Sequence, residues 1–380
     1  MKICMISGAY PAMKCGIGDY TARLVAQLAE HGLEVDVLTC RDPYVAAGTH
    51  PAVRVFPELS AVPVLDARAI ARHCKAHRCE VIHIQYPTWP FRRSLSISFL
   101  PAALRLSGAG PVVTTFHEVA SCHPVNRLRL IPMVYTSAAS TATTHEDCRW
   151  LTGRLPGIRN RVARIPIGAN IEPADGTPGG VCDEYRKKLG IAAGETAMCY
   201  FGFPLRNKLI EDLLSAFRRA LDAGARLRLV FMTGLERTEG SYAVEILKLI
   251  ETLRLSRHVI DTGFLPPAEV SRCFAACDFA ALLFRDGASF RRGSILAAMA
   301  HGLPVLSCRS GAPAEGLEHG ENILLPEAGD VPGLAQNMVE LCNDPALRRR
   351  LHRASLATAE QFAWPLIAER TVALYRRILQ

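Results

Sequence analysis

A basic, glycine-containing segment in the C-terminal half carries the residue types best suited to chemistry. Asp286–Ser294 follows the apolar run Phe279–Phe284, and its candidate binding residues are Ser289, Arg291, Arg292, Gly293 and Ser294. Ser294 is the expected N-cap of a short helix, and the backbone amides at such a helix start favour an anion. Two arginines beside that end are hard to explain by packing. The segment therefore predicts a phosphate-binding site.

Two further cations lie in the turn after the predicted strand Ala197–Gly202. Arg206 and Lys208 stand where a helix is expected to begin. Cations beside a helix start form a clamp that suits a diphosphate. The alternative interpretation is a solvated loop that contains two basic residues.

Glycines also interrupt the connection between the first predicted strand and the first predicted helix. The sequence Gly16-Ile-Gly18-Asp19 leaves backbone amides accessible near the helix start. A nicotinamide-binding fingerprint is disfavoured, because Thr21 occupies the position of its third small residue and the preceding loop is too long for its tight turn. Alternatively, the glycines only shape the loop and Asp19 only caps the helix.

His117 follows the buried strand predicted over Pro111–Phe116. It therefore emerges at the carboxyl end of a strand, where open α/β sheets place binding and catalytic residues. The alternative is a hydrogen-bonded histidine without a functional role. Other chemistries lack their residues, since the sequence has no DxD pair, GxxxxGK[ST], HExxH or GxSxG motif.

The elements that must position these residues alternate along the chain. Short apolar runs and helical patterns follow one another, which is typical of a parallel sheet with helices on both faces. In the N-terminal half the expected strands are 2–7, 35–39, 53–56, 81–85, 111–116, 138–144 and 161–166, and the expected helices are 20–32 and 65–76.

A change of composition divides the chain. Gly168–Gly180 contains two prolines and four glycines and is predicted to be a linker. Beyond it, strands are expected at 197–202, 226–233, 259–263, 279–284, 305–307 and 323–325, and helices at 208–223, 242–253, 268–276, 294–301, 331–343 and 345–361. The predicted fold class is α/β, with two doubly wound Rossmann-like domains, residues 1–170 and 181–364, facing each other across a cleft and joined by a linker at 171–180.

Composition and charge narrow the class of protein. The 380 residues are 49% hydrophobic and 21% charged, which suits two domains with proper cores. The net charge of +8 is scattered, and aromatic residues make up only 7%, so an anionic ligand or membrane surface is favoured over nucleic acid. The thirteen cysteines fit no metal or redox motif. Without a secretory leader, they predict free thiols in a cytoplasmic protein.

One segment of the N-terminal half has two interpretations, a surface element that contacts a membrane and a buried helix. Trp89-Pro-Phe-Arg92-Arg93 precedes the apolar stretch Leu95–Leu106, a pattern found where a basic, amphipathic surface meets anionic lipid. We expect peripheral contact at the inner face of a membrane as one possibility and a buried helix, the preferred alternative, as the other. No stretch of 18 apolar residues predicts a membrane span.

The order and spacing of these sites resemble family 4 of the retaining nucleotide-sugar glycosyltransferases, which have the GT-B fold. The similarity covers nearly the whole chain, and the ordered set is specific although each match alone is weak. The matching motifs are Gly16-Ile-Gly18, His117, Ile165-Pro-Ile-Gly168, Tyr200-Phe-Gly202 with Lys208, Gly263-Phe-Leu-Pro266, Cys277-Asp278, Leu296–Val305 and Phe362-Ala-Trp364.

The resemblance implies a hexosyltransferase-like enzyme. It implies transfer of a sugar from an NDP-sugar to a saccharide, lipid-linked glycan or small metabolite, with retention, without a metal, and with a phosphate oxygen of the donor taking the acceptor's proton. The donor would lie on the C-terminal domain, and the last helix, about 365–380, would cross back over the N-terminal domain.

The resemblance also implies roles for individual residues. Arg206 and Lys208 would neutralise the departing diphosphate, and Gly293 and Ser294 would present a helix end to it. Gly16 and Gly18 would approach the phosphates or the sugar, and His117 would contact the donor sugar. Asp19 is the candidate for holding the acceptor hydroxyl.

The sequence departs from the family at the paired glutamates that normally hold the donor sugar and the ribose. Ser289 and Ala297 occupy their positions, and Phe203 replaces the usual first arginine after Gly202. The retained cations favour an active, divergent enzyme. The alternatives are a catalytically silent partner or regulator of another transferase, and a nucleotide-sugar epimerase, for which no acid/base carboxylates are found.

Overall fold

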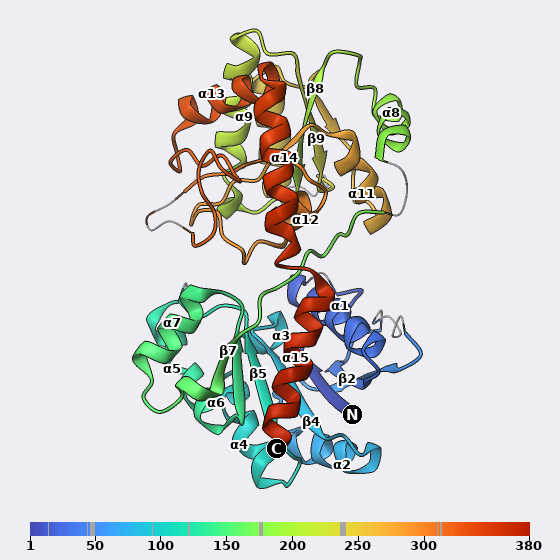
Figure 1. Ribbon diagram of the computed structural model, residues 1–380, viewed down its shortest axis with the longest axis vertical. Helices are drawn as coiled ribbons and strands as arrows, with labels where there is room; N and C mark the ends of the chain where they lie inside the picture. Colours follow the sequence, from blue (N-terminus) through green and yellow to red (C-terminus); the bar gives the residue numbers. More distant parts are fainter. Residues whose placement is uncertain are drawn as a thin grey trace. The chain divides into compact units, whose positions relative to one another are not determined.

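The computed structural model divides into two compact units, one formed by Met1–Gly168 with Phe362–Gln380 and the other by Ala169–Gln361 (Figure 1). The described residues are 1–13, 15–43, 45, 50–92, 94–120, 122–174, 178–235, 241–309, 311 and 314–380. The predictions for Arg93 and for linker residues 175–177 lie outside them.

Seven parallel strands form the sheet of the N-terminal unit, in the order β3-β2-β1-β4-β5-β6-β7. Their bounds are β1 (Lys2–Ser7), β2 (Glu34–Cys40), β3 (Val53–Leu59), β4 (Val81–Tyr86), β5 (Val112–Phe116), β6 (Ala139–Ala142) and β7 (Val162–Arg164). The order reverses between β1 and β4, so a topological switch point lies at the centre of the sheet.

Helices cover both faces of this sheet. Ile3 and Met5 of β1 pack with α1 and α15, whereas Cys4 and Ile6 pack with α2 and α4. This alternation explains why the strand is a continuous apolar run in the sequence. The helices are α1 (Gly16–Glu30), α2 (Ala67–His77), α3 (Trp89–Arg92), α4 (Leu100–Leu106), α5 (Pro124–Leu128), α6 (Leu130–Thr136), α7 (His145–Arg154) and α15 (Trp364–Leu379).

The C-terminal unit repeats the plan with a five-stranded parallel sheet, in the order β10-β9-β8-β11-β12. Its strands are β8 (Thr196–Phe201), β9 (Leu227–Met232), β10 (Val259–Asp261), β11 (Phe279–Ala281) and β12 (Val305–Leu306). Its helices are α8 (Pro178–Lys188), α9 (Ile210–Asp222), α10 (Tyr242–Thr252), α11 (Pro267–Ala276), α12 (Gly293–Ala300), α13 (Val331–Asn343) and α14 (Pro345–Glu360).

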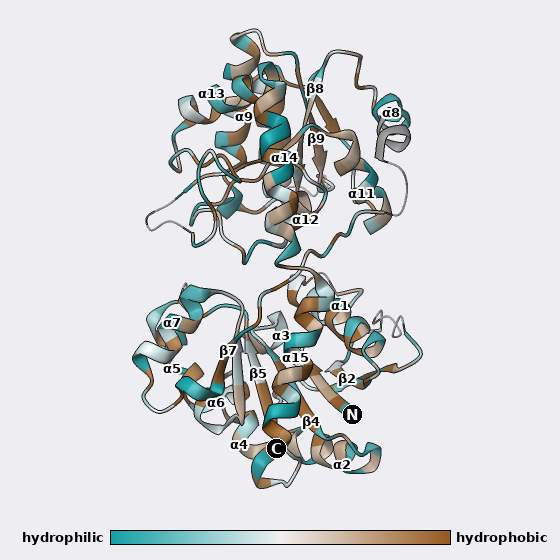
Figure 2. Cartoon of the chain, viewed as in Figure 1, coloured by the Kyte–Doolittle hydropathy of each residue, from teal (hydrophilic) through white to brown (hydrophobic). Residues whose placement is uncertain are grey.

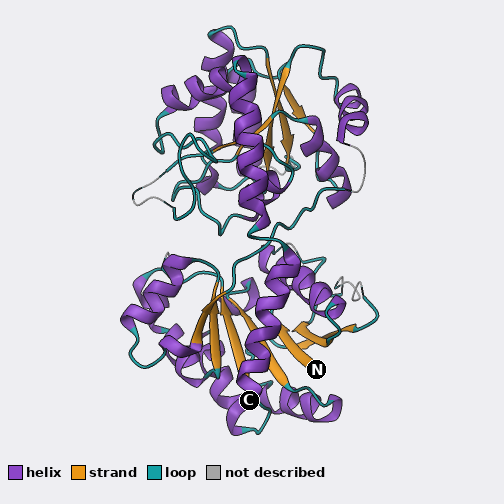
Figure 3. Cartoon of the chain, viewed as in Figure 1, coloured by secondary structure: helices purple, strands orange, loops and turns teal. Residues whose placement is uncertain are grey.

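The core of the C-terminal unit also lies on both faces of its sheet. Met198 and Tyr200 of β8 pack with α9 and α13, whereas Ala197 and Cys199 pack with α11 and α12. Figure 2 shows hydrophobic colour along the strands and both colours on the covering helices. The predicted α/β class with two doubly wound, Rossmann-like parallel sheets is confirmed (Figure 3).

Several predicted boundaries differ from the structure by a few residues, and three differences have a clear local cause. Helix α1 begins at Gly16 rather than Tyr20, because the first helical turn tolerates glycine. Helix α8 begins at Pro178, inside the segment predicted to be a linker, because proline is favoured at the first helical position. Leu324 makes only an isolated bridge to Leu306, and Pro326 has no N–H with which to extend a strand.

The segment predicted to meet a membrane forms three short helical pieces, α3, the 3₁₀ helix Leu95–Phe99 and α4. Phe91, Ile97 and Leu104 are buried, whereas Trp89 is 69% and Leu106 90% exposed. The segment therefore packs on the sheet and also leaves apolar side chains accessible, and membrane contact stays a prediction. Across the described residues, helices long and apolar enough to traverse a bilayer are absent.

The last helix completes the N-terminal unit. Trp364, at the start of α15, is buried, and its ring lies 5.4 Å from that of Tyr20. A Cβ atom on Gly168 would lie 2.6 Å from Trp364 Cε2, so the absence of a side chain at Gly168 allows this packing. Near the other end of α15, the Tyr375 hydroxyl hydrogen-bonds to Nδ1 of the buried His83, at 2.5 Å.

We predict that Gly168→Ala lowers the free energy of unfolding of the N-terminal unit by about 1–3 kcal/mol, because the added methyl overpacks the contact with Trp364. All three tryptophans, Trp89, Trp150 and Trp364, belong to this unit, so urea unfolding followed by tryptophan fluorescence reports on it. Gly153→Ala is the matched control, since no atom lies within 4 Å of its Cβ position in α7. Equal stability of the two variants would contradict the packing role of Gly168.

Candidate functional site

Lys208 and Arg292 meet beside one aromatic ring in the C-terminal unit. The Lys208 ammonium lies 4.1 Å, and the Arg292 guanidinium 4.6 Å, from the centre of the Phe284 ring. Arg292 also forms an ion pair with Asp286. The turn that carries Lys208 is fixed to this segment by the Arg285 N–H, which donates to the Asn207 carbonyl at 2.9 Å. The fold therefore brings together cations that are far apart in the sequence.

The surroundings of Lys208 disfavour its charge. Burial, followed by repulsion from Arg292, lowers the pKa of Lys208 to about 8, while Asp286 acts in the opposite direction. A bound anion would favour the protonated form of such a lysine. The site can thus bind a negatively charged group and gain a full positive charge at Lys208 in doing so.

The second component of this site is the start of α12. The Arg292 N–H donates to the Ser289 carbonyl at 3.1 Å, and the Arg292 carbonyl accepts from Ile295 and Leu296, at 2.9 and 3.2 Å. The amides of Gly293 and Ser294 therefore lie in the first turn, where helical N–H groups have no partner within the helix. Such a turn favours an anion.

Ser294 is not the N-cap, and this prediction was wrong. The helix begins at Gly293 with Arg292 at the N-cap, because the turn closed by Ser289 brings Arg292 into that position. Arg291 and Ser294 are both partly buried within the same segment. Gly293 approaches Asn170, whose amide nitrogen would lie 3.5 Å from a Cβ atom there.

The Arg206 side chain contacts helix α10. Arg206 lies in the 3₁₀ helix η3 (Arg206–Lys208), but its side chain is 66% exposed and pairs with Glu245 of α10 at 2.6 Å. Its guanidinium also lies 4.9 Å from the centre of the Tyr242 ring. Lys208 and Arg292 therefore lie near the same ring, whereas the Arg206 side chain contacts α10.

The paired-glutamate positions hold no carboxylate in this protein. Ala297 is fully buried and belongs to the core between α11, α12 and the sheet. Ser289 is partly buried, and its carbonyl closes the turn before α12. Asp286, an acidic residue of the same segment, forms an ion pair with Arg292.

In the N-terminal unit, the two glycines of the first connection lie in the first turn of α1. A Cβ atom on Gly18 would be 3.2 Å from the Ala9 carbonyl, so this position requires a very small residue. Gly16 is exposed, with open space where a side chain would stand. Asp19 has solvent access, yet partial desolvation raises its pKa to about 6, against the effect of Arg23.

His117 follows β5 and lies beside the neighbouring strand β4. Its Nε2–H donates to Gln85 Oε1 at 2.9 Å, and its ring meets the edge of Tyr20 at 4.8 Å between centres. Desolvation lowers the pKa of His117 to about 3, so the imidazole is neutral at physiological pH. With Nε2 donating to Gln85, Nδ1 is left as a hydrogen-bond acceptor. His117 can therefore orient a hydroxyl group but cannot contribute charge.

Three contributors to these sites were not predicted from the sequence. Phe284 was assigned only to a strand, and Gln85 lies inside an apolar run. Leu209 adopts a left-handed conformation, with φ 46°, between η3 and α9, although it is not glycine. A non-glycine residue with positive φ carries no sequence signal, and the aromatic contact depends on tertiary packing.

Comparison with known families connects this geometry to an enzyme class. Residues 196–344 match the family described as "Glycosyl transferases group 1", and residues 15–173 match "Glycosyltransferase Family 4". The chain is 25% identical over 414 residues to D-inositol 3-phosphate glycosyltransferase of Corynebacterium diphtheriae, covering 99% of this chain and 94% of that protein. It is 28% identical over 199 residues to N-acetyl-alpha-D-glucosaminyl L-malate synthase of Bacillus anthracis, a match to 52% of this chain and 49% of that protein.

Solved structures share the fold across the whole chain. Sucrose-phosphate synthase from Thermosynechococcus elongatus has a TM-score of 0.76 at 21% identity, with 100% of this chain and 99% of that chain covered. Anabaena HepE, solved with UDP and glucose, has a TM-score of 0.77 at 19% identity, with 99% and 100% covered. The family matches and these likenesses together show that the chain belongs to the group 1, family 4-like glycosyltransferases and is a transferase with the GT-B fold.

Proposed function

We propose that this glycosyltransferase uses an NDP-sugar and binds its diphosphate at Lys208, Arg292 and the first turn of α12. The observation that carries the proposal is the convergence of both cations on Phe284 beside that turn. HepE, which shares the fold, was solved with UDP, which supports a nucleotide donor. The proposed reaction retains the configuration at the anomeric carbon and uses no metal.

The chemistry of the leaving group explains why cations are needed. When the glycosidic bond to the donor breaks, negative charge develops on the diphosphate. Charges and amides fixed in a partly desolvated site stabilise that charge without reorganising. Lys208 is best placed for this role, because burial has already removed part of its hydration. Arg292 and the Gly293 and Ser294 amides complete the anion site.

The N-terminal unit supplies the remaining proposed contacts. His117, neutral and held by Gln85, accepts a hydrogen bond from a donor-sugar hydroxyl through Nδ1. Gly16 and Gly18 let the backbone approach the phosphates or the sugar. Asp19, which is ionised above about pH 6, accepts the hydrogen bond of the acceptor hydroxyl. A phosphate oxygen of the donor takes the proton of that hydroxyl.

Nucleotide recognition differs from the usual family pattern in this proposal. With alanine buried at position 297, the ribose is not gripped by a carboxylate there. Binding energy comes instead mainly from the diphosphate, with Ser289 and Arg291 at the edge of the same segment. The loss of both glutamates also supports the second candidate function, a silent partner of another transferase.

The acceptor is a hydroxyl-bearing saccharide, lipid-linked glycan or small metabolite. Curated relatives are named for D-inositol 3-phosphate, L-malate and phosphatidyl-myo-inositol, which supports small polar acceptors and lipid-bearing ones alike. The exposed Trp89 and Leu106 support peripheral contact with an anionic membrane. A cytoplasmic location remains part of this proposal.

We predict that Lys208→Ala lowers kcat/KM for the donor about 10²–10³-fold, because the charge that develops on the diphosphate loses its desolvated cation. The measurement is NDP release from a panel of NDP-sugars. Lys248→Ala, which removes an exposed lysine of α10, is the matched control and should change kcat/KM less than about twofold.

The same assay distinguishes the contributions of Arg206 and Lys208, the two basic residues of η3. Arg206→Ala should cost less than Lys208→Ala, since its exposed guanidinium is already paired with Glu245. A decrease in kcat/KM of less than about threefold in Lys208→Ala would show that Lys208 does not bind the diphosphate. Absence of NDP release from every donor, with a folded protein, would favour the silent partner.

Nucleotide affinity should depend on pH through Lys208. Its pKa of about 8 means that the lysine is charged below pH 8 and neutral above it, so binding of a diphosphate takes up a proton at high pH. We predict a constant Kd between pH 6.5 and 7.5 and a Kd that rises up to about tenfold per pH unit above 8. Lys208→Arg, whose guanidinium stays charged, should abolish the rise. If Kd rises equally in Lys208→Arg, a group other than Lys208 causes the pH dependence.

A further inference from the structure

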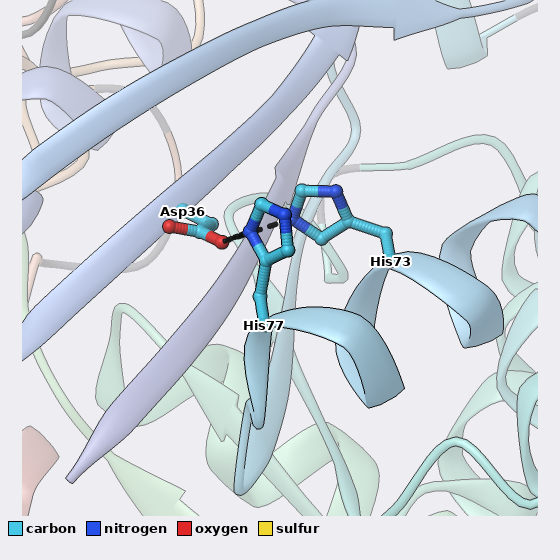
Figure 4. A group of neighbouring side chains, drawn as sticks. All are labelled: Asp36, His73 and His77. Carbon is cyan, nitrogen blue, oxygen red and sulfur yellow. Dashed lines mark hydrogen bonds and ion pairs between the residues drawn. The ribbon is translucent and has the colours of Figure 1, made fainter.

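Asp36, His73 and His77 form a polar cluster in the N-terminal unit, remote from the carboxyl ends of the strands (Figure 4). Asp36 lies near the start of β2, and the two histidines lie in the last turns of α2. Because helices of such folds run antiparallel to their strands, the end of α2 lies beside the strand starts. The sugar-transfer site proposed above lies at the opposite edge of the sheet and does not use these residues.

Both histidines approach the same oxygen atom. His73 Nε2 lies 3.0 Å, and His77 Nδ1 2.5 Å, from Asp36 Oδ2. The spacing of four residues puts both imidazoles on one face of α2, with ring centres 4.0 Å apart. One nitrogen from each ring and one carboxylate oxygen all lie within 4.8 Å of one another. Figure 4 shows both rings pointing from the helix towards the strand.

We propose that these three side chains bind a divalent transition-metal ion of the Zn²⁺ class. Two imidazole nitrogens and one carboxylate oxygen are a ligand set that Zn²⁺ accepts, with water in the fourth tetrahedral position. Mg²⁺ and Ca²⁺ prefer sites made of oxygen atoms, so they fit this set poorly. When the ion binds, His73 Nε2 and His77 Nδ1 are unprotonated and donate their lone pairs to it. Each ring then carries its proton on its other nitrogen.

The second oxygen of Asp36 is already held in the way that metal-binding carboxylates require. Arg54 donates two hydrogen bonds to Oδ1, at 3.0 and 2.8 Å, and leaves Oδ2 facing the histidines. Such outer contacts fix the orientation of a ligand. The positive charges of Arg54 and of Lys2, 3.9 Å from Oδ1, oppose a cation. Arg54 is 49% exposed, so solvent screens part of this repulsion.

The three proposed ligands differ in their exposure to solvent. The side chains of Asp36 and His73 are 1% and 10% exposed, whereas that of His77 is 28% exposed. A metal ion can therefore arrive past His77 and meet ligands held by the core. The bound ion would connect α2 to β2 and stabilise this edge of the N-terminal unit. Its role is structural, and sugar transfer does not depend on it.

The test uses the full chain, freed of metal with a chelator and titrated with Zn²⁺ and, separately, Co²⁺. We expect one Zn²⁺ per chain by competition with a chromophoric chelator, a Zn²⁺-dependent rise in melting temperature, and the visible absorption of tetrahedral Co²⁺. His77→Gln, at the more exposed ligand, should lower affinity by at least the roughly 100-fold that loss of an outer-shell partner can reach. His31→Ala is the matched control, since His31 is an exposed histidine of the same unit, and it should bind as the wild type does.

Three results would overturn the proposal. The first is less than one ion per chain at saturation, and the second is equal affinity in His77→Gln and the wild type. The third is a near-ultraviolet charge-transfer band from thiolate to Co²⁺. That band would show that cysteine thiolates bind the metal instead of the two histidines and Asp36. A circular dichroism spectrum like that of the wild type shows that His77→Gln is folded, so its result is interpretable.

Discussion

Lys208 and Arg292 carry like charges and are held next to the same ring, Phe284, which costs electrostatic free energy in a partly desolvated place. Burial, and after it repulsion from Arg292, lowers the pKa of Lys208 to about 8. Asp286 offsets part of that cost through Arg292. A diphosphate would supply further negative charge at the start of α12. The proposed donor site depends on this pair, because Lys208 and Arg292 supply the positive charge beside the start of α12.

The parallel sheets explain why the two units can carry such sites at all. In each sheet the strands are buried on both faces, so the side chains proposed for sugar transfer lie near the carboxyl ends of the strands. His117 and Gln85 lie at the ends of neighbouring strands β5 and β4, and Lys208 follows β8. The buried contact between Gly168 and Trp364 joins the last helix to the N-terminal unit, so the chain's two ends support one sheet.

Much of the fold was predictable because buried parallel strands are continuous apolar runs. β1 has the predicted bounds, and most other strands differ by only a few residues. Failures occurred where local signals have two meanings. Pro178 and Gly16 were interpreted as loop residues, yet both are tolerated at the start of a helix. Leu324 lies in an apolar run, but its pairing with Leu306 is an isolated bridge rather than part of a continuous strand.

The candidate site was predictable in residue type and less so in geometry. Glycine and arginine before an apolar helix predict an anion site, and in the structure Arg292 and Gly293 lie at the start of α12. The sequence does not show that Arg206 pairs with Glu245, since the two are 39 residues apart. Asp36 and His73 are separated by 37 residues, so only tertiary structure brings them together. Contacts between distant segments depend on packing, which no local pattern encodes.

In the proposed mechanism, the C-terminal unit holds a nucleoside diphosphate. The most direct test is calorimetric titration of the full chain with UDP, GDP, ADP, dTDP and CMP. We expect saturable binding of one nucleoside diphosphate at one site per chain, and weaker binding of the monophosphate CMP, which lacks the second phosphate. Absence of binding by all five to folded protein would contradict this mechanism and would make the lost carboxylates at Ser289 and Ala297 decisive.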